Sequence, residues 1–200
     1  FEALAQRAGA SRLRVLVLDG NALGGRGADA LAAAAKAGAL DALEELRLNN
    51  CQLGEEGASA LFEALAQRAG ASRLRHLSLD GNALSGRGPG ALVAAVNASV
   101  LDGIEELWLQ TCQLSDEDVA ALVEALAQCS RASLCVLALG CNRLSSRTAG
   151  AMAAALQRGV LPALGTLGLN GNTFSESEKT QIKAGWDGCA AHPPGHGLVI

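Results

Sequence analysis

The chain has 200 residues, enough for one domain with a substantial core, and half of them are hydrophobic although only three are Phe, two Trp and none Tyr. With 16 basic and 20 acidic residues, its formal charge of −4 does not give the basic surface that nucleic-acid binding requires. No run of about 18 apolar residues predicts a transmembrane helix, so we expect no membrane insertion. The apolar content is rich in alanine, which predicts thin, closely approaching core layers.

The first segment predicts a helix and introduces an internal repeat. FEALAQRAGAS occupies residues 1–11 and returns at 62–72. The next segment, LRVLVLDGNAL at 13–23, returns as LRHLSLDGNAL at 74–84, and the related LEELRLNNCQL lies between them at 43–53. Self-similarity at a fixed period predicts an architecture built from stacked repeats.

Six copies of one template, LxxLxLxx[NC]xL, follow one another along the chain. They begin at residues 13, 43, 74, 104, 134 and 164. In each copy the LxL core predicts a short strand whose leucines point inward and whose alternate residues point to solvent. We expect parallel strands near 14–18, 44–48, 75–79, 105–109, 135–139 and 165–169. We expect burial of their paired leucines: Leu16, Leu18, Leu46, Leu48, Leu77, Leu79, Leu107, Leu109, Leu137, Leu139, Leu167 and Leu169.

A helix is predicted after each strand, because apolar residues four apart fall on one helical face. The first apolar column is Leu31, Leu61, Leu92, Leu122, Met152 and Ile182. The expected helices lie near 27–37, 57–69, 88–98, 116–129, 147–158 and 176–185. At the end of the chain, Trp186 would cover the last core layer and residues 197–200 would add an edge strand.

Units of strand, turn, helix and return loop on this template resemble the leucine-rich repeats of the ribonuclease-inhibitor-like class. Ribonuclease inhibitor, the sensor arms of NOD-like receptors and Ran GTPase-activating proteins are members. The resemblance covers residues 1 to about 190. It implies a right-handed α/β solenoid of six strand–helix repeats of 30–31 residues, with the parallel sheet on the concave face and the helices on the convex face of a horseshoe.

We therefore expect a single leucine-rich-repeat solenoid domain over residues 1–200. Residues 1–12 would be the helix of a truncated preceding repeat, 13–174 the repeats, and 175–200 the last helix and the C-terminal cap. Because the helical pattern begins at Phe1, we also expect the 200 residues to be a fragment of a longer chain.

The ninth template position alternates between asparagine and cysteine, except that the last two copies both have asparagine. Asn21, Asn82, Asn142 and Asn172 are expected to turn inward and satisfy backbone groups where the strand bends. Cys51 and Cys112 take this position in intervening repeats, and strands about 4.8 Å apart would hold them roughly 10 Å from each other, beyond disulfide reach. We expect all six cysteines to be reduced and the protein to be intracellular, in the cytoplasm.

Two patterns suggest ligand binding, and each has a simpler interpretation. The glycines of residues 20–29 and 81–90 predict a tight strand-to-helix turn, since the Gly-Lys-Ser/Thr ending of a phosphate-binding loop is missing. Cys189, His192 and His196 could hold zinc but lack a fourth ligand, and a terminal cap explains that segment better. We expect no metal and no cofactor.

The acidic residues do not predict catalysis. Asp19, Asp80 and the loop acids at 116–118 are dispersed over an open surface, where nothing should shift their pKa values strongly. No Ser/His/Asp or Cys/His constellation is present to supply a nucleophile. We therefore expect no catalytic residues and no enzymatic activity.

The residues between the inward leucines predict the solvent face of the sheet. Arg14 and Arg75 alternate there with glutamates at 44–45 and 105–106, which can pair across strands without any partner. Trp108 should stand between Ser78 and Ala138, small neighbours that leave its ring clear as a binding anchor. Alternatively, the indole lies over Arg47 or fills a gap on the sheet surface.

These residues favour a non-enzymatic scaffold that binds a protein partner through the concave sheet, anchored by Trp108. Arg47, His76 and Gln110 would add hydrogen bonds, and Glu45 and Glu106 would favour a partner with basic groups. A GTPase-regulating module like the Ran GTPase-activating proteins, the sensor arm of a NOD-like receptor and a structural accessory subunit of a large assembly are the alternatives. The sequence leaves these, and the oligomeric state, open.

Overall fold

The computed structural model describes residues 12–67, 73–128, 133–188 and 197–200. Strands and helices alternate in the order β1 (Val15–Val17), α2 (Gly24–Lys36), β2 (Glu45–Arg47), α3 (Gly54–Ala66), β3 (His76–Ser78), α4 (Arg87–Asn97), β4 (Glu106–Trp108), α5 (Asp116–Gln128), β5 (Val136–Ala138), α6 (Ser146–Gln157), β6 (Thr166–Gly168), α7 (Glu176–Asp187) and β7 (Leu198–Val199). The seven strands form one sheet whose spatial order follows the chain.

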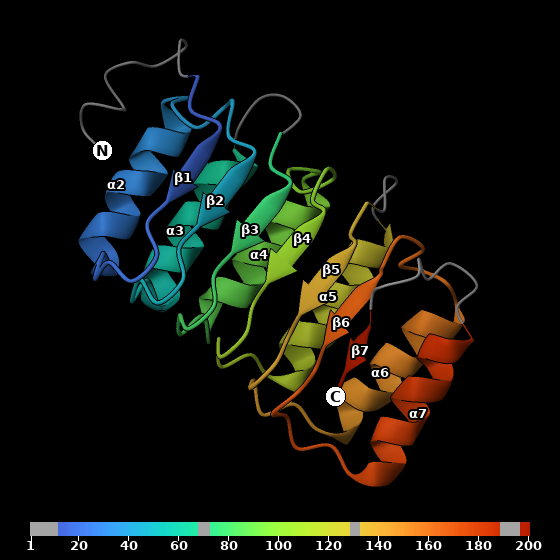
Figure 1. The fold of residues 1–200 in the computed structure, drawn as a ribbon. Helices are drawn as coiled ribbons and strands as arrows, with labels where there is room; N and C mark the ends of the chain where they lie inside the picture. The colour runs from blue at the N-terminus through green and yellow to red at the C-terminus, as the bar shows by residue number, and fades with distance from the viewer. Residues whose placement is uncertain (1–11, 68–72, 129–132, 189–196) are drawn as a thin grey trace.

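The molecule has two layers, and each unit adds one strand and one helix to them. All neighbouring strands are parallel, and the helices lie together on one side of the sheet (Figure 1). A parallel pair needs a crossover connection, and the helix of each unit supplies it. The predicted α/β solenoid is therefore confirmed. We call the side of the sheet that carries no helix the strand face.

The strand register keeps equivalent template positions side by side. The middle residue of each strand pairs with a leucine of the next, as in Leu46 with Leu77 and Leu77 with Leu107. Ten of the twelve leucines expected inside have no exposed surface: Leu46, Leu48, Leu77, Leu79, Leu107, Leu109, Leu137, Leu139, Leu167 and Leu169. The prediction is wrong for Leu16 and Leu18, which are only partly buried, because β1 is an edge strand with a neighbour on one side.

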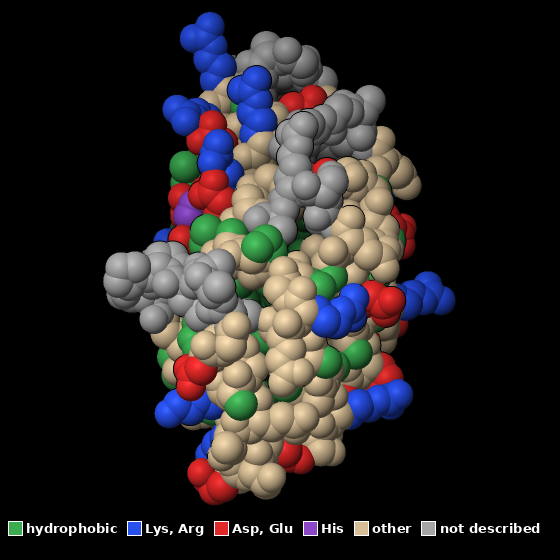
Figure 2. Space-filling view, turned by 90° about the vertical axis from the view of Figure 1, so that its right-hand side faces the viewer, with side chains coloured by type: hydrophobic (Ala, Val, Ile, Leu, Met, Phe, Trp, Pro, Cys, Tyr) green, Lys and Arg blue, Asp and Glu red, His purple; other side chains and the backbone are tan. Residues whose placement is uncertain are grey.

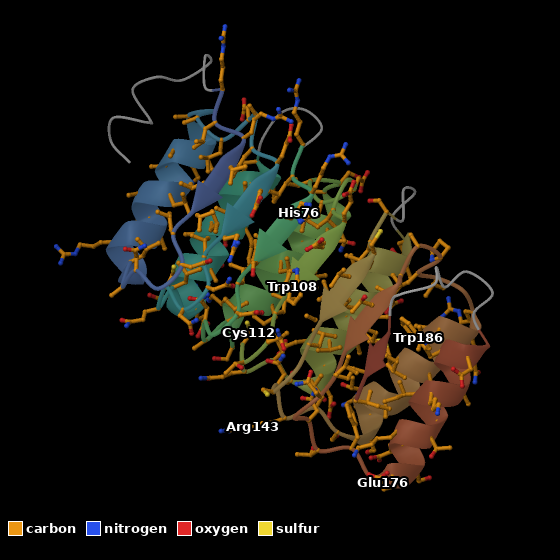
Figure 3. All side chains as sticks on the ribbon, in the orientation of Figure 1. His76, Trp108, Cys112, Arg143, Glu176 and Trp186 are labelled. Carbon is orange, nitrogen blue, oxygen red and sulfur yellow. The ribbon has the colours of Figure 1, made fainter. Side chains whose placement is uncertain are left out.

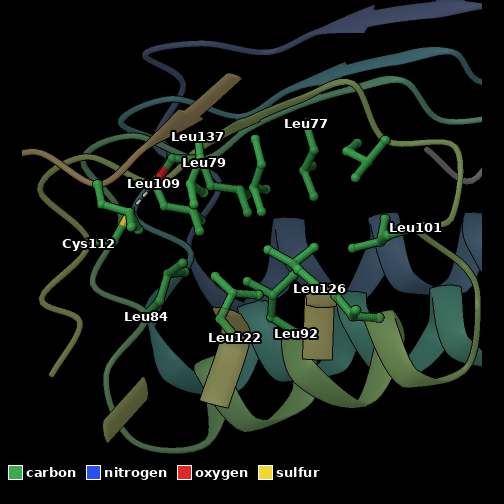
Figure 4. Packing of buried hydrophobic residues seen from close by; sticks show 14 of the residues in the cluster. Leu77, Leu79, Leu84, Leu92, Leu101, Leu109, Cys112, Leu122, Leu126 and Leu137 are labelled. Carbon is green, nitrogen blue, oxygen red and sulfur yellow. Dashed lines mark hydrogen bonds between the residues drawn. The ribbon is translucent and has the colours of Figure 1, made fainter. Parts of the chain in front are cut away.

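The core is the thin layer between the strands and the helices. Leu77, Leu79 and Leu109 of the strand segments face Leu92 and Leu122 of the helices (Figure 4). Each such leucine, moved from water into the core, contributes about 2 kcal/mol before the loss of chain entropy is counted. Alanines fill the places where neighbouring helices meet, which explains why so few aromatic residues are needed.

The first two helices begin three residues earlier than predicted, at Gly24 and Gly54 instead of 27 and 57. Both glycines have positive φ values, 55° and 66°, which residues with a side chain rarely adopt. They let the chain turn directly from the loop into the helix. At Gly57 the neighbouring helix is so close that an added Cβ would lie 2.6 Å from the Cβ of Ala28.

The C-terminal cap has the predicted form where it is described. β7 pairs with β6 at the sheet edge, and Trp186 is buried with 7% exposure. α7 extends to Asp187, slightly beyond the expected end at 185. The expected helix at 1–11 and the residues considered for zinc binding, Cys189, His192 and His196, lie outside the described residues.

The cysteine prediction is confirmed for four residues, since Cys51, Cys112, Cys135 and Cys141 are free thiols. Cys129 and Cys189 lie outside the described residues. In the part of the chain that the structure describes, no helix combines the length and the apolar character needed to cross a membrane.

Candidate functional site

A ladder of buried amides holds the strand ends in place. Asn82 donates from Nδ2 to the carbonyls of Leu48 (2.7 Å) and Leu79 (2.8 Å), and its Oδ1 accepts from the backbone N–H groups of Cys51 (3.1 Å) and Leu53 (3.2 Å). Asn142 makes the equivalent bonds one double repeat later. Each asparagine therefore binds two repeats together, as predicted for a residue that turns inward.

The ladder is less buried at its ends. Asn172 is half-buried but makes the same four backbone bonds as Asn82 and Asn142. Asn21 is exposed and donates to the carbonyl of Leu18 (2.7 Å), as Asn82 does to that of Leu79. Asn21 therefore satisfies backbone carbonyls where the strand bends, as predicted, but it is exposed because it stands in the first repeat that the structure describes. At the alternate positions the Cys51 thiol donates to the Leu18 carbonyl (3.1 Å) and the Cys112 thiol to the Leu79 carbonyl (3.3 Å). Burial raises the pKa of Cys112 to about 12, so this thiol stays protonated and inert.

A second row of polar side chains runs along the strand exits on the strand face. Asp19 Oδ1 accepts from the backbone of Asn49 (2.8 Å), Asn49 Oδ1 accepts from that of Asp80 (2.8 Å), and Asp80 Oδ1 accepts from that of Gln110 (2.7 Å). The Gln110 side-chain amide also donates to Asp80 Oδ2 (3.2 Å). These bonds hold the side chains against the sheet, so that the row is rigid.

One carboxylate of this row, that of Asp80, has a shifted pKa. Burial raises the pKa of Asp80 above its ordinary value, and its hydrogen bonds from Gln110 offset only part of that effect. The carboxylate is half-buried because the neighbouring side chains of the row enclose it. Its negative charge is therefore disfavoured in the free protein.

Opposite charges pair across the strands, as predicted. Arg14 lies 2.7 Å from Glu44, and Arg75 pairs with Glu105 one double repeat later. The hydrogen bond from Arg14 lowers the pKa of Glu44. In Figure 2 the basic and acidic side chains intermix in the upper left of the view, where the histidine lies beside acidic side chains. Solvent screens such exposed pairs, so they contribute little to stability.

Trp108 has the predicted neighbours but not the predicted exposure. It pairs with Ser78 on one side and Ala138 on the other, yet it is half-buried. The reason lies along its own strand, where Glu106 accepts a hydrogen bond from the indole Nε1 (3.1 Å). The same Glu106 oxygen lies 3.2 Å from Nδ1 of His76 on the adjacent strand. Figure 3 shows His76 and Trp108 on these neighbouring strands. The carboxylate thus fixes both rings.

Five of the six residues expected to bind a partner line one hollow of about 340 Å³ on the strand face, which we call the strand-face pocket. Its lining is Glu45, Arg47, Asn49, His76, Ser78, Asp80, Glu106 and Trp108. Gln110 does not line it but is hydrogen-bonded to Asp80 beside it. The sequence prediction missed Asn49, Ser78 and Asp80. Their template positions, which face outward in the same repeats, could have identified them.

Two of the acidic residues at 116–118, Asp116 and Asp118, hydrogen-bond at the starts of helices. They lie in the first turn of α5, not on a loop. Asp116 accepts hydrogen bonds from Ser145 and Thr148 of the next repeat, including both backbone N–H groups (2.9 and 3.3 Å). Burial raises the pKa of Asp116, but these bonds outweigh it and the net pKa is lowered. Asp116 therefore caps the start of α6.

No group of three or more His, Cys, Asp or Glu side chains within the described ranges is arranged to hold a metal ion. The strand-face pocket combines carboxylates with an aromatic ring, a guanidinium and an imidazole. These are groups that recognise another molecule by charge and by contact.

Comparison with known families agrees with the template. Models described as leucine-rich repeat match residues 11–32, 43–62 and 73–94. The chain contains leucine-rich repeats. The matched segments cover the first three template copies, and the later copies continue the same strand register. Proteins built from leucine-rich repeats are typically non-enzymatic binding scaffolds, whose extended surfaces take up protein partners. No curated protein matches the chain.

Proposed function

We propose that this leucine-rich-repeat chain is a non-enzymatic scaffold that binds a partner protein through the strand face, with the strand-face pocket at the centre of the contact. The observation that carries the proposal is the position of Trp108. It lines a preformed hollow on a rigid sheet, where Glu106 already holds its indole. Aromatic side chains held in this way dominate binding energies, because they lose little freedom when the partner arrives.

The other residues of the site have supporting roles. Arg47 and His76 line the pocket beside Trp108 and would donate hydrogen bonds to the partner. Gln110 would extend the contact from its place next to Asp80. Glu45 and Glu106 favour a partner with basic groups at the matching positions.

Two broader features support a finer assignment within the same proposal. Repeats of 30–31 residues with a full helix in every unit support the ribonuclease-inhibitor-like class. The four free thiols support an intracellular site of action, since reducing compartments keep cysteines unpaired.

The test begins with peptides selected from a random display library on the immobilised wild-type chain. Their affinities are then measured by calorimetry for wild type, Trp108→Ala and Lys36→Ala. Lys36 is the matched control, because it is exposed in the last turn of α2 on the helix side. We expect Trp108→Ala to weaken binding by about 2 kcal/mol, roughly thirtyfold, and Lys36→Ala to have no effect. Unchanged affinity in Trp108→Ala, or loss in Lys36→Ala, would move the site away from the strand face.

A further inference from the structure

The strand-face pocket holds more negative than positive charge. Its lining has three carboxylates, Glu45, Asp80 and Glu106, against one guanidinium and one imidazole. The guanidinium of Arg47 is already compensated, since it lies 2.9 Å from Asp19 and 3.9 Å from Glu45. A hollow with unbalanced carboxylates attracts a cation, and it does so more strongly than an open surface because its walls limit screening.

The aromatic ring of Trp108 restricts the kind of cation that suits the strand-face pocket. Trp108 lines the pocket together with the carboxylates, and its own N–H is taken up by Glu106. An indole beside carboxylates suits a flat, weakly hydrated cation that stacks on the ring and donates several hydrogen bonds at its edge. The guanidinium group of arginine has this geometry, and two carboxylates can share its donors.

Asp80 gives independent support. The equivalent position is asparagine in the second and sixth repeats, Asn49 and Asn170, so the fold accepts a neutral amide there. The third repeat nevertheless has a carboxylate, as the first has in Asp19, and burial raises the pKa of Asp80, so its charge is unfavourable in the free protein. A cation bound in the pocket would offset the unfavourable free energy of the ionised Asp80 carboxylate.

We infer that the strand-face pocket binds one arginine side chain of the partner protein, stacked against Trp108 and neutralised by Glu106, Glu45 and Asp80. The inference rests on the proposed function and names the chemistry that the site recognises. The arginine would be the partner's central contact, and the polar row along the strand exits would surround it.

The direct test uses a blocked amino acid, N-acetyl-arginine amide, as the probe. Its binding is followed by the NMR signal of the Trp108 indole N–H, whose hydrogen bond to Glu106 makes it sensitive to a guest. Trp186, in α7 at the far end of the sheet, is the internal control. We expect the Trp108 signal to shift in a saturable way and the Trp186 signal to stay in place. N-acetyl-citrulline amide, a neutral analogue of the same shape, should bind roughly tenfold more weakly.

Charge-neutral variants complete the test. Glu106→Gln and Glu45→Gln should each weaken arginine binding several-fold, while Glu105→Gln should not. Glu105 is the matched control, because it precedes Glu106 in the chain but pairs with Arg75 and does not line the pocket. Equal binding of the arginine and citrulline probes, or no shift with either, would overturn the inference. If the arginine probe failed but the selected peptides still lost affinity in Trp108→Ala, the proposed scaffold function would stand and the arginine inference alone would fall. If the peptides bound Trp108→Ala as tightly as wild type, the proposed function and the arginine inference would both fail.

Discussion

Asn82 shows how one small side chain can hold two repeats together. Its amide is fully buried and satisfies two carbonyls and two N–H groups that belong to different repeats. Asn21 has the same template position but is exposed, and among the described residues its side-chain hydrogen bonds stay within its own turn. The pair therefore offers a controlled comparison of one residue type in two environments.

We predict that Asn82→Ala lowers the free energy of unfolding by about 3 kcal/mol, because it leaves buried backbone groups without partners. Asn21→Ala should cost less than about 1 kcal/mol, since water can replace its bonds. Urea denaturation of both variants measures the difference. Similar losses of unfolding free energy in Asn82→Ala and Asn21→Ala would show that the buried hydrogen bonds of Asn82 do not provide the extra stability.

Asp80 should reduce the stability of the free protein at neutral pH. Its pKa is raised in the folded state, so the native protein binds the proton more tightly than the unfolded chain does. The ionised carboxylate therefore destabilises the fold above its folded pKa, and the penalty disappears as the pH falls below the unfolded pKa. We predict that Asp80→Asn raises the free energy of unfolding at pH 7 by about 0.5 kcal/mol, a small gain because solvent screens a half-exposed group.

The measurement is urea denaturation of wild type and Asp80→Asn from pH 7 down to pH 3. The advantage of the variant should shrink as the pH falls. A variant that is less stable than wild type at pH 7 would contradict this account of Asp80, and with it the support that Asp80 gives to arginine binding.

The sequence predicted the neighbours of Trp108 but not its exposure. The repeat fixes the strand register, so Ser78 and Ala138 could be placed beside the ring by counting. The hydrogen bond from the indole to Glu106 depends on side-chain rotamers along one strand, and the template says nothing about these. The enclosure of Asp80 by its row was missed for the same reason.

At the scale of the helix, the structure shows caps that come from a neighbouring repeat. Asp116 of α5 caps α6, and Glu55 of α3 accepts from the first N–H of α4, that of Arg87 (2.8 Å). The α7 cap, in contrast, is a local capping box of Ser175 and Glu178. Sequence rules for capping search within one turn of the same helix, so they find the local box and miss carboxylates about thirty residues away.

We predict that Asp116→Ala destabilises the protein by about 1–2 kcal/mol through the loss of the α6 cap. Glu117→Ala is the control, because Glu117 is an exposed neighbour whose pair with Arg147 contributes little. The pKa of Asp116 is lowered by folding, so its contribution is present above the unfolded pKa and is lost as the pH falls through the folded pKa. Urea denaturation at pH 7 and pH 3 measures both the stability lost in Asp116→Ala and the decrease of that loss at low pH. Equal costs for the two variants at pH 7 would rule out the cap.

At the scale of the whole molecule, the solenoid is a row of units that each contact their neighbours. Stability in such a row is approximately the sum of the unit terms and the interfaces between them. α5 packs less closely against α4 and α6 than α3 packs against α2 and α4, and a groove of about 360 Å³ lies between α5 and α6. The interfaces on both sides of α5 are therefore the weak part of the array.

We predict that the amides of α5 exchange with solvent hydrogen faster than those of α3 under native conditions. Both helices have 13 residues and a neighbour on each side, so the comparison isolates packing. Hydrogen exchange followed by mass spectrometry provides the measurement. Protection in α5 that equals or exceeds that of α3 would show that the looser packing does not lower local stability.

The repeat period also explains how much of the whole fold could be predicted. Thirty-residue spacing placed every strand of the six copies, because a parallel stack allows one strand per unit. The early starts of α2 and α3 were missed, since they depend on Gly24 and Gly54 adopting positive φ values. The looser packing around α5 was missed as well, because α5 is as rich in alanine and leucine as the closely packed α3.

We propose that the strand face, and not the helix side, binds the partner. The most direct measurement is a map of backbone amide shifts in an NMR spectrum as a selected peptide is added. We expect the shifts to concentrate in β2, β3 and β4, the strands that supply Glu45, His76 and Trp108 to the strand-face pocket. Shifts concentrated in helices α2 to α7, with these three strands unaffected, would contradict binding through the strand face.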